Sequence, residues 1–285
     1  MDQPLKLTLL DLPRATQPLF PMVAVAEKAG FSRYWVTEHF EPKPDGVGSA
    51  LVCASVAATL TSKIRIGTAG ILIRYYPAAL AAIQFRALAT LFPGRIDAGL
   101  AGGWAHNQAA LDADLRDWVF ESKLERTITE TRSKEWQPMN GTPPPLWYFG
   151  ASAQSARMTG GLGIGYGYAL QFTTNTDDPG AIAAYRQNFI PTEFQPKPAS
   201  CIAVAGLCSD SVADAERQVT TALETWAGGT DPRIVGTPQT CRDGLFALAE
   251  RYRVNEIVFL NLSREWEPAC RSLELLGEVL SLERP

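Results

Sequence analysis

The sequence predicts an α/β protein with the architecture of a (β/α)8 barrel, and three observations indicate this fold class. Short apolar segments alternate with helical segments along almost the whole chain. Eight such pairs can be counted, the number that closes a TIM barrel. The length of 285 residues suits one barrel, and no linker, repeat or low-complexity tract divides it. We therefore expect residues 1–285 to form a single TIM-barrel domain.

The expected strands are short and apolar, as strands buried on both faces should be. They cover residues 5–10, 34–37, 64–69, 96–101, 146–149, 165–170, 200–206 and 256–260. The expected helices cover residues 18–29, 49–60, 77–91, 118–136, 152–162, 179–189, 211–226, 239–251 and 266–282.

The stretch from Ile64 to Trp104 is the most informative part of the chain. Its helix opens with Pro77, because a missing N–H costs little at a first helical position. The turn Phe92-Pro93-Gly94-Arg95 ends that helix. A strand, helix and strand of this length form a parallel pair with a right-handed crossover. Strands 64–69 and 96–101 should therefore pair in parallel.

Charge and composition exclude several classes of partner. The net charge of −4 provides no basic surface for nucleic acid or anionic membranes. No apolar run approaches the ~20 residues of a membrane-spanning helix, and the N-terminus lacks a basic signal region. The five cysteines are odd in number and scattered, without C-x-x-C spacing. A reduced, cytoplasmic location is the expectation.

Reactive groups of a (β/α)8 barrel lie at the C-terminal ends of its strands. Polar, aromatic and glycine residues follow these ends in the sequence. They are Glu38, His39 and Phe40; Ala69, Gly70, Arg74, Tyr75 and Tyr76; Ala101, Gly102, Trp104, His106 and Asn107; Ala151, Ser152 and Ser155; and Gln171. Both histidines of the chain therefore fall at the same end of the expected barrel.

Four segments resemble the bacterial luciferase-like monooxygenases, a family of (β/α)8 enzymes that use flavin or deazaflavin. Residues 30–39 resemble the family's G-F-x-x-x-W-x-x-E-H strand, and residues 64–70 with Pro93-Gly94-Arg95 resemble its I-R-x-G-T-A…P-G-R signature. Residues 150–163 resemble its G-x-S-x-x-S-A…L-G segment, and residues 234–238 its I-V-G-T/S-P segment. The four segments occur in the family's order along nearly the whole chain.

The resemblance implies roles for residues at the second and third strand ends. His39 would lie near the reactive edge of the flavin as an acid/base, for which a near-neutral pKa is suited. Glu38 is expected to be catalytic together with His39, and a core histidine bonded to Glu38 is the structural alternative. Ala69-Gly70 would form a non-proline cis peptide against the isoalloxazine ring. The alternative is that Gly70 only ends a strand.

Ser152 and Ser155 flank the start of the fifth helix, and Ala151 precedes them. Free backbone N–H groups and the helix dipole favour a phosphate at such a position. Ser152 is also a good N-cap residue, and capping is compatible with phosphate binding. The resemblance implies that this helix start holds the phosphate of the flavin.

One position departs from the family pattern. Where the luciferase branch has a phosphate-binding arginine after the fourth strand, this chain has Gly102. Arg74 or Arg157 could compensate, and Arg74 is the better candidate because it follows the third strand. The Ala101-Gly102-Gly103-Trp104 sequence also resembles the G-x-G-W of the deazaflavin branch. FMN is the expected cofactor because residues 150–169 and 234–238 resemble the FMN-using branch, and F420 is the alternative.

The expected function is a two-component monooxygenase that uses O2 and reduced FMN, the latter supplied by a separate flavin reductase, to oxidise a small organic substrate. An apolar pocket could be lined by Trp35, Phe40, Tyr75, Tyr76 and Trp104, with His106 nearby, although aromatic residues more often pack in cores. Helices 49–60 and 77–91 are apolar nearly all round, which predicts a homodimer through these helices.

Three other functions remain open at this stage. The first is an F420-dependent oxidoreductase. The second is a homologue with altered or lost flavin binding that acts on or binds a pathway intermediate, which Gly102 would explain. The third is a metal-dependent barrel hydrolase, which needs several histidine and carboxylate ligands; with only two histidines in the chain, we expect no metal site.

Overall fold

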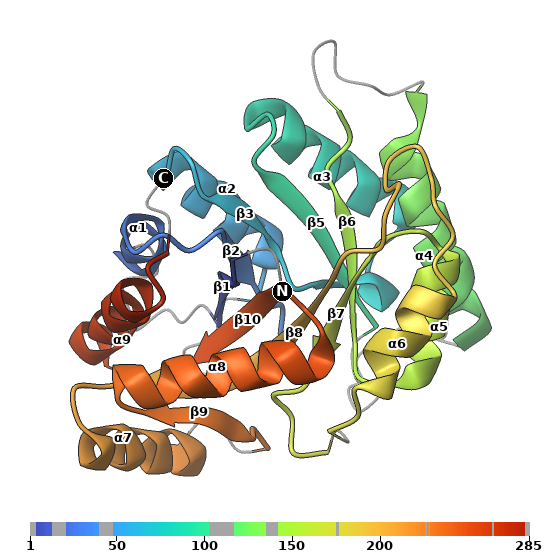
Figure 1. The fold of residues 1–285 in the computed structure, drawn as a ribbon. Helices are drawn as coiled ribbons and strands as arrows, with labels where there is room; N and C mark the ends of the chain where they lie inside the picture. Colours follow the sequence, from blue (N-terminus) through green and yellow to red (C-terminus); the bar gives the residue numbers. More distant parts are fainter. Residues whose placement is uncertain are drawn as a thin grey trace.

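Eight parallel strands, each paired with its neighbours, form a closed ring with helices outside it (Figure 1). The computed structural model describes residues 4–12, 21–39, 48–102, 117–134, 142–174, 177–225, 227, 229–263 and 265–282. The barrel strands, in spatial order, are β1 (Lys6–Asp11), β2 (Arg33–Val36), β3 (Arg65–Thr68), β5 (Ile96–Ala101), β6 (Leu146–Gly150), β7 (Gly165–Ala169), β8 (Ser200–Cys208) and β10 (Glu256–Asn261). Pairing of β10 with both β1 and β8 closes the ring, so the predicted (β/α)8 fold is confirmed.

Two short strands were not predicted from the sequence. β4 (Ile71–Leu72) pairs with β5 and continues the path of β3. β9 (Pro232–Gly236) pairs with the second half of β8, beyond an irregularity at Ala205/Gly206. Both are hard to see in the sequence, because β4 has two residues and β9 begins with a proline after a glycine-rich break.

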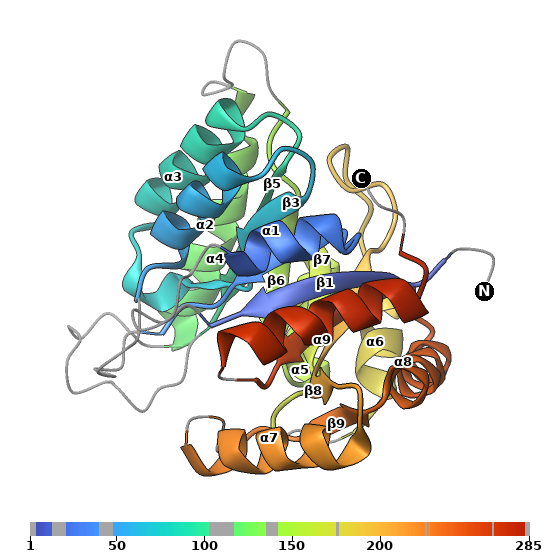
Figure 2. The ribbon, with the colours of Figure 1, turned by 90° about the vertical axis from the view of Figure 1, so that its left-hand side faces the viewer.

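Helices cover the outside of the barrel (Figure 1, Figure 2). Their bounds are α1 (Pro21–Lys28), α2 (Ala50–Leu60), η1 (Ile73–Tyr75), α3 (Ala78–Leu91), α4 (Asp117–Arg132), α5 (Ala153–Gly161), α6 (Gly180–Gln187), α7 (Val212–Thr225), α8 (Pro238–Tyr252) and α9 (Trp266–Val279). The expected helix at 77–91 begins one residue later, because Pro77 is its N-cap. The expected helix at 118–136 ends at Arg132, and the one at 266–282 ends at Val279.

The predicted parallel pairing of strands 64–69 and 96–101 is confirmed, and its turn has a structural explanation. β3 pairs with β5 in parallel register, Ile66 opposite Ile96. The Arg95 guanidinium donates hydrogen bonds to the carbonyl oxygens of Ala58 and Thr61, at the end of α2. Gly94 has φ 74°, a conformation that side-chain-bearing residues rarely adopt. The Pro-Gly-Arg turn after α3 is therefore bonded, through Arg95, to the end of the preceding helix α2.

The interior of the barrel has an aromatic layer. Trp35 of β2 lies 5.2 Å, between ring centroids, from both Trp147 and Phe149 of β6. Because β2 and β6 are not neighbours in the sheet, these rings meet across the barrel interior. Trp35 is fully buried and donates to Asp97 at 3.1 Å. Trp35 is therefore part of the barrel core, as the alternative interpretation of the aromatic residues expected, and does not line a substrate pocket.

Below this layer, toward the strand starts, lies an ion-pair network that the sequence did not reveal. Asp97 pairs with Arg33 at 2.6 Å and with Arg65 at 2.6 Å. Arg33 also pairs with Glu256 at 2.8 Å. Burial opposes ionisation of Asp97, but the two guanidinium groups hold its pKa below the usual range. The network closes the N-terminal end of the barrel with fully paired charges.

Candidate functional site

The C-terminal ends of three neighbouring strands lie at one level of the barrel. Leu72 of β4 pairs with Ala101 of β5, and Ala101 pairs with Phe149 of β6. The chain therefore reaches this rim of the barrel side by side at Leu72, Ala101 and Phe149. This register brings together three of the five strand ends at which the sequence predicted reactive groups.

The peptide bond between Ala69 and Gly70 is cis. A side chain at Gly70 would be blocked by the neighbouring strand, because a Cβ there would lie 2.5 Å from the Leu100 backbone nitrogen. The requirement for glycine at this position thus comes from the close approach of β5. The cis peptide falls where the family resemblance implies it.

Glu38 is held by groups from the neighbouring rim of the barrel. Its carboxylate accepts hydrogen bonds from the Tyr76 hydroxyl at 2.7 Å, the Leu72 backbone N–H at 2.8 Å and the Ala50 backbone N–H at 3.3 Å. Burial raises the pKa of Glu38, and these hydrogen bonds oppose the rise. One buried side chain thereby fixes the start of α2, strand β4 and the residue after η1.

The structure describes only some of the other residues that were predicted at this end of the barrel. His39 is solvent-exposed, directly after the buried Glu38, while Tyr75 and Tyr76 are half-buried. Phe40, Trp104, His106 and Asn107 lie outside the described residues, so their predicted roles stay predictions.

Gly102 lies against a tyrosine and a phenylalanine that sequence reasoning did not single out. A Cβ at Gly102 would lie 3.1 Å from the Tyr148 hydroxyl and 3.6 Å from the Phe120 ring. The Arg74 guanidinium packs over that same Phe120 ring, 4.5 Å from its centroid. Burial raises the pKa of Tyr148 to about 12, and the charge of Arg74 opposes the rise. The space beside Gly102 is therefore occupied by a cluster that contains a different arginine.

The start of α5 has the capping arrangement that the sequence predicted. Ser152 is the N-cap, and it forms a reciprocal capping box with Ser155. The Tyr166 hydroxyl lies 3.1 Å from Ser155 Oγ and donates to the Ser152 carbonyl oxygen at 3.2 Å. Ser152 itself is exposed. The first backbone N–H groups of a helix that starts in this way point toward the rim of the barrel beyond β6, where an anion could bind.

The described part of the chain contains no group of three histidine, cysteine or carboxylate side chains arranged to hold a metal ion. All five cysteines are buried free thiols. Within the same residues, no helix combines the length and the apolar character needed to cross a membrane.

Comparison with known proteins shows the family. The family model described as "Luciferase-like monooxygenase" matches residues 14–256, which is most of the chain. The chain belongs to the luciferase-like monooxygenase family. It is 28% identical to the uncharacterized protein YwcH of Bacillus subtilis, over 94% of each chain. It is also 28% identical to a luciferase-like monooxygenase of Escherichia coli, over 68% of this chain and 61% of the relative.

Solved structures share the fold at low sequence identity. Apo-MsnO8 superposes with a TM-score of 0.82 at 24% identity, over 98% of both chains. The oxygenating constituent of 3,6-diketocamphane monooxygenase from Pseudomonas putida, in complex with FMN, gives 0.76 at 16% identity, over 98% of both chains. An F420-dependent secondary alcohol dehydrogenase gives 0.72 at 16% identity, over 98% of this chain and 99% of the other. The fold thus hosts FMN and F420 in different proteins.

Proposed function

We propose that this protein is an FMN-dependent monooxygenase that receives reduced flavin from a separate reductase and uses O2 to oxidise a small organic substrate. The observation that carries the proposal is the register of Leu72, Ala101 and Phe149, because it sets the cis peptide, the Arg74 cluster and the start of α5 side by side. Family membership supports the oxidoreductase class.

The described residues fit a flat, phosphate-bearing cofactor. The capping box of Ser152 and Ser155 fixes a helix start suited to a phosphate group. Arg74 would supply the positive charge that Gly102 does not, since it lies in the cluster that a side chain at Gly102 would enter. Ala69, Gly70, Ala101 and Ala151 would offer backbone and small side chains to the ring system. FMN, when bound, supplies the redox chemistry with O2.

Two residues at the end of β2 have separate proposed tasks. His39 is exposed at the rim and would move a proton during the reaction. Glu38 would hold the surrounding backbone, since three hydrogen bonds already engage its carboxylate. Half-buried Tyr75 and Tyr76, with Phe40, Trp104 and His106, would form the substrate pocket. A small, largely apolar substrate suits these residue types.

An anaerobic titration with reduced FMN, followed by admission of oxygen, tests this proposal. We expect binding of reduced FMN, oxygen consumption above that of free flavin, and loss of product formation in His39→Ala with retained FMN binding. Binding of F420 alone would move the protein to the deazaflavin-dependent enzymes. Binding of neither cofactor would favour the homologue with a lost flavin site.

The F420-dependent oxidoreductase is the second candidate, and one observation favours it. Gly102 leaves the position of the luciferase-branch arginine without a charge, as in the G-x-G-W pattern of the deazaflavin branch. The parallel F420 titration therefore belongs in the same experiment.

We also propose a cytoplasmic homodimer that associates through α2 and α3. Five large apolar side chains on these two helices are substantially exposed, namely Val52, Leu60, Leu80, Ile83 and Leu91. Both helices lie outside β3 and β5, on one flank of the barrel (Figure 2). Apolar surface of this extent is usually covered by a partner.

A further inference from the structure

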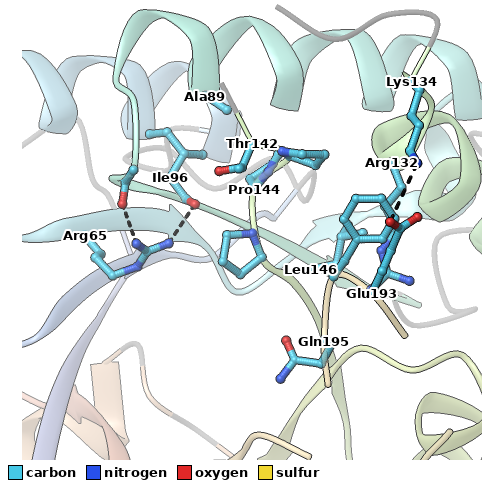
Figure 3. Close-up of a pocket in the computed structure, with 14 residues that line it drawn as sticks. Arg65, Ala89, Ile96, Arg132, Lys134, Thr142, Pro144, Leu146, Glu193 and Gln195 are labelled. Carbon is cyan, nitrogen blue, oxygen red and sulfur yellow. Dashed lines mark hydrogen bonds and ion pairs between the residues drawn. The ribbon is translucent and has the colours of Figure 1, made fainter. Parts of the chain in front are cut away.

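A pocket of about 450 Å³ (Figure 3) lies at the strand starts, the end of the barrel opposite to the candidate site. Arg65, Ile96 and Leu146, the first residues of β3, β5 and β6, contribute to its lining. Its size falls within the range that small-molecule ligands occupy. Because β3, β5 and β6 run from this pocket toward the rim with the cis peptide, the two sites are separated by the length of the strands.

The middle of the pocket is apolar. Pro144, Leu146 and Ile96 are buried residues that border it, and Figure 3 shows them between Arg65 on one side and Arg132 on the other. Phe194 adds an aromatic ring to the lining. A ligand here would need an apolar body to cover these groups.

The positive charge of the pocket is not neutralised at the Arg132 end. Arg132 is half-buried, packs over the Phe194 ring at 5.2 Å and donates to the Gly163 carbonyl oxygen at 3.0 Å. Among the residues that the structure describes, no carboxylate forms an ion pair with Arg132. Burial accordingly lowers the pKa of Arg132, with no anion to offset it. A half-buried cation with no carboxylate paired to it favours an anionic ligand.

Lys134 adds a second cation at the same end. Its ion pair with Glu193 is long, at 3.7 Å, and both side chains are mostly exposed, so the pair is weak. Arg65, at the other end, is already engaged by Asp97 and by the carbonyl oxygens of Gly94 and Ile96. The excess positive charge therefore lies at Arg132 and Lys134.

We propose that this pocket binds a small organic carboxylate, whose anionic group pairs with Arg132 and Lys134 and whose apolar body lies against Pro144, Leu146 and Ile96. Such a ligand complements both features of the pocket, the excess positive charge at one end and the apolar surface in the middle. The site is separate from the cofactor site and does not depend on the proposed monooxygenase activity.

Isothermal titration of the full chain without flavin tests the proposal, with 2-naphthoate as the probe. The neutral isostere 2-naphthamide and inorganic phosphate are titrated in parallel. We expect 2-naphthoate to bind, and the amide and phosphate to bind at least about tenfold more weakly, because each lacks one of the two features. Equal binding of acid and amide, or of acid and phosphate, would overturn it.

Substitutions with opposite expected signs locate the binding. Arg132→Met should weaken 2-naphthoate binding about tenfold or more, since it removes a charge-assisted contact. Glu193→Gln should strengthen binding about two- to threefold, because it frees Lys134. Lys134→Gln should weaken it by a similar factor. Arg126→Gln, on the exposed face of the same helix α4, is the matched control and should change nothing.

Circular dichroism melts identify any variant that fails to fold. Arg132→Met removes the hydrogen-bond donor of the Gly163 carbonyl, so this variant is the one that could fail to fold. Lys134 and Glu193 are exposed side chains, and their opposite effects keep the test decisive in folded protein. If neither changes the affinity, the probe binds elsewhere and the proposal is wrong, whatever the flavin titration shows.

Discussion

The Tyr76 hydroxyl donates a hydrogen bond of 2.7 Å to the buried Glu38 carboxylate. This contact joins the end of β2 to the segment that follows β4, directly beside the exposed His39. It gives Glu38 a positioning role that its place in the sequence motif does not reveal. A role in the chemistry itself stays a prediction.

Replacement of Glu38 should reduce stability more than replacement of its partner. Glu38→Gln leaves one or two of the three donors poorly satisfied, and we expect a loss of about 1–3 kcal/mol. Tyr76→Phe should cost about 1 kcal/mol. Urea unfolding monitored by fluorescence measures both. If Glu38→Gln is as stable as the wild type, the three hydrogen bonds to the Glu38 carboxylate do not contribute to the stability of the fold.

The pH dependence of that loss has a definite sign. Because burial raises the pKa of Glu38 in the folded state, its contribution to stability is largest below the ordinary carboxyl pKa and falls as pH rises through the folded pKa. The difference in unfolding free energy between wild type and Glu38→Gln should therefore narrow as the pH rises above the ordinary carboxyl pKa of 4.5. A difference that widens over this interval would contradict the assignment.

Asp97→Asn should be strongly destabilising, by about 3–5 kcal/mol, because it leaves Arg65 without an ion-pair partner and Arg33 with Glu256 alone. The pKa of Asp97 is lowered in the folded protein, so its contribution is present above the ordinary value of 3.8 and is lost as pH falls through the folded pKa. Urea unfolding at neutral and acidic pH measures both effects. Asp243→Asn, an exposed carboxylate paired with Arg242, is the control and should cost under about 1 kcal/mol.

Arg74→Met should weaken FMN binding about ten- to a hundredfold if Arg74 replaces the arginine missing at position 102. Methionine keeps apolar contact with Phe120, so the loss reports charge. Arg157→Met, on the exposed face of α5, should leave affinity unchanged. Fluorescence titration of both variants compares the two arginines that the sequence offered, and a larger effect at Arg157 would reverse the assignment.

Ser155→Ala should affect phosphate-bearing and phosphate-free flavins differently. It removes half of the capping box and the contact with Tyr166, at a cost of about 1 kcal/mol in helix stability. FMN affinity should fall severalfold, while the weaker affinity for riboflavin should stay the same. Parallel titrations with the two flavins measure the difference. An equal loss for both would mean that the start of α5 does not hold the phosphate.

A single charge on the exposed flank should separate the proposed dimer. Ile83→Glu places a carboxylate on the apolar surface of α3, where the wild-type side chain is 47% exposed. Light scattering coupled to size-exclusion chromatography should show a shift from dimer to monomer. Ile190→Glu, an exposed apolar position away from α2 and α3, should leave the mass unchanged. A monomeric wild type would overturn the dimer proposal.

The sequence by itself determined the fold and the capping at the start of α5. All eight barrel strands are visible because a strand buried on both faces must be apolar, whatever it packs against. The capping of α5 by Ser152 is equally local, since the side chain bonds a backbone N–H three residues away. Signals confined to one segment can be recognised without knowing its neighbours.

Only the tertiary structure decided which side chains meet. The network of Arg33, Asp97 and Glu256 joins three strands, and no spacing in the sequence indicates it. The same holds for Tyr148 and Phe120 beside Gly102. These contacts depend on the register and closure of the barrel, which set distances between residues far apart in the chain. Propensity and periodicity act within a segment, whereas the chemistry of a site depends on positions between segments.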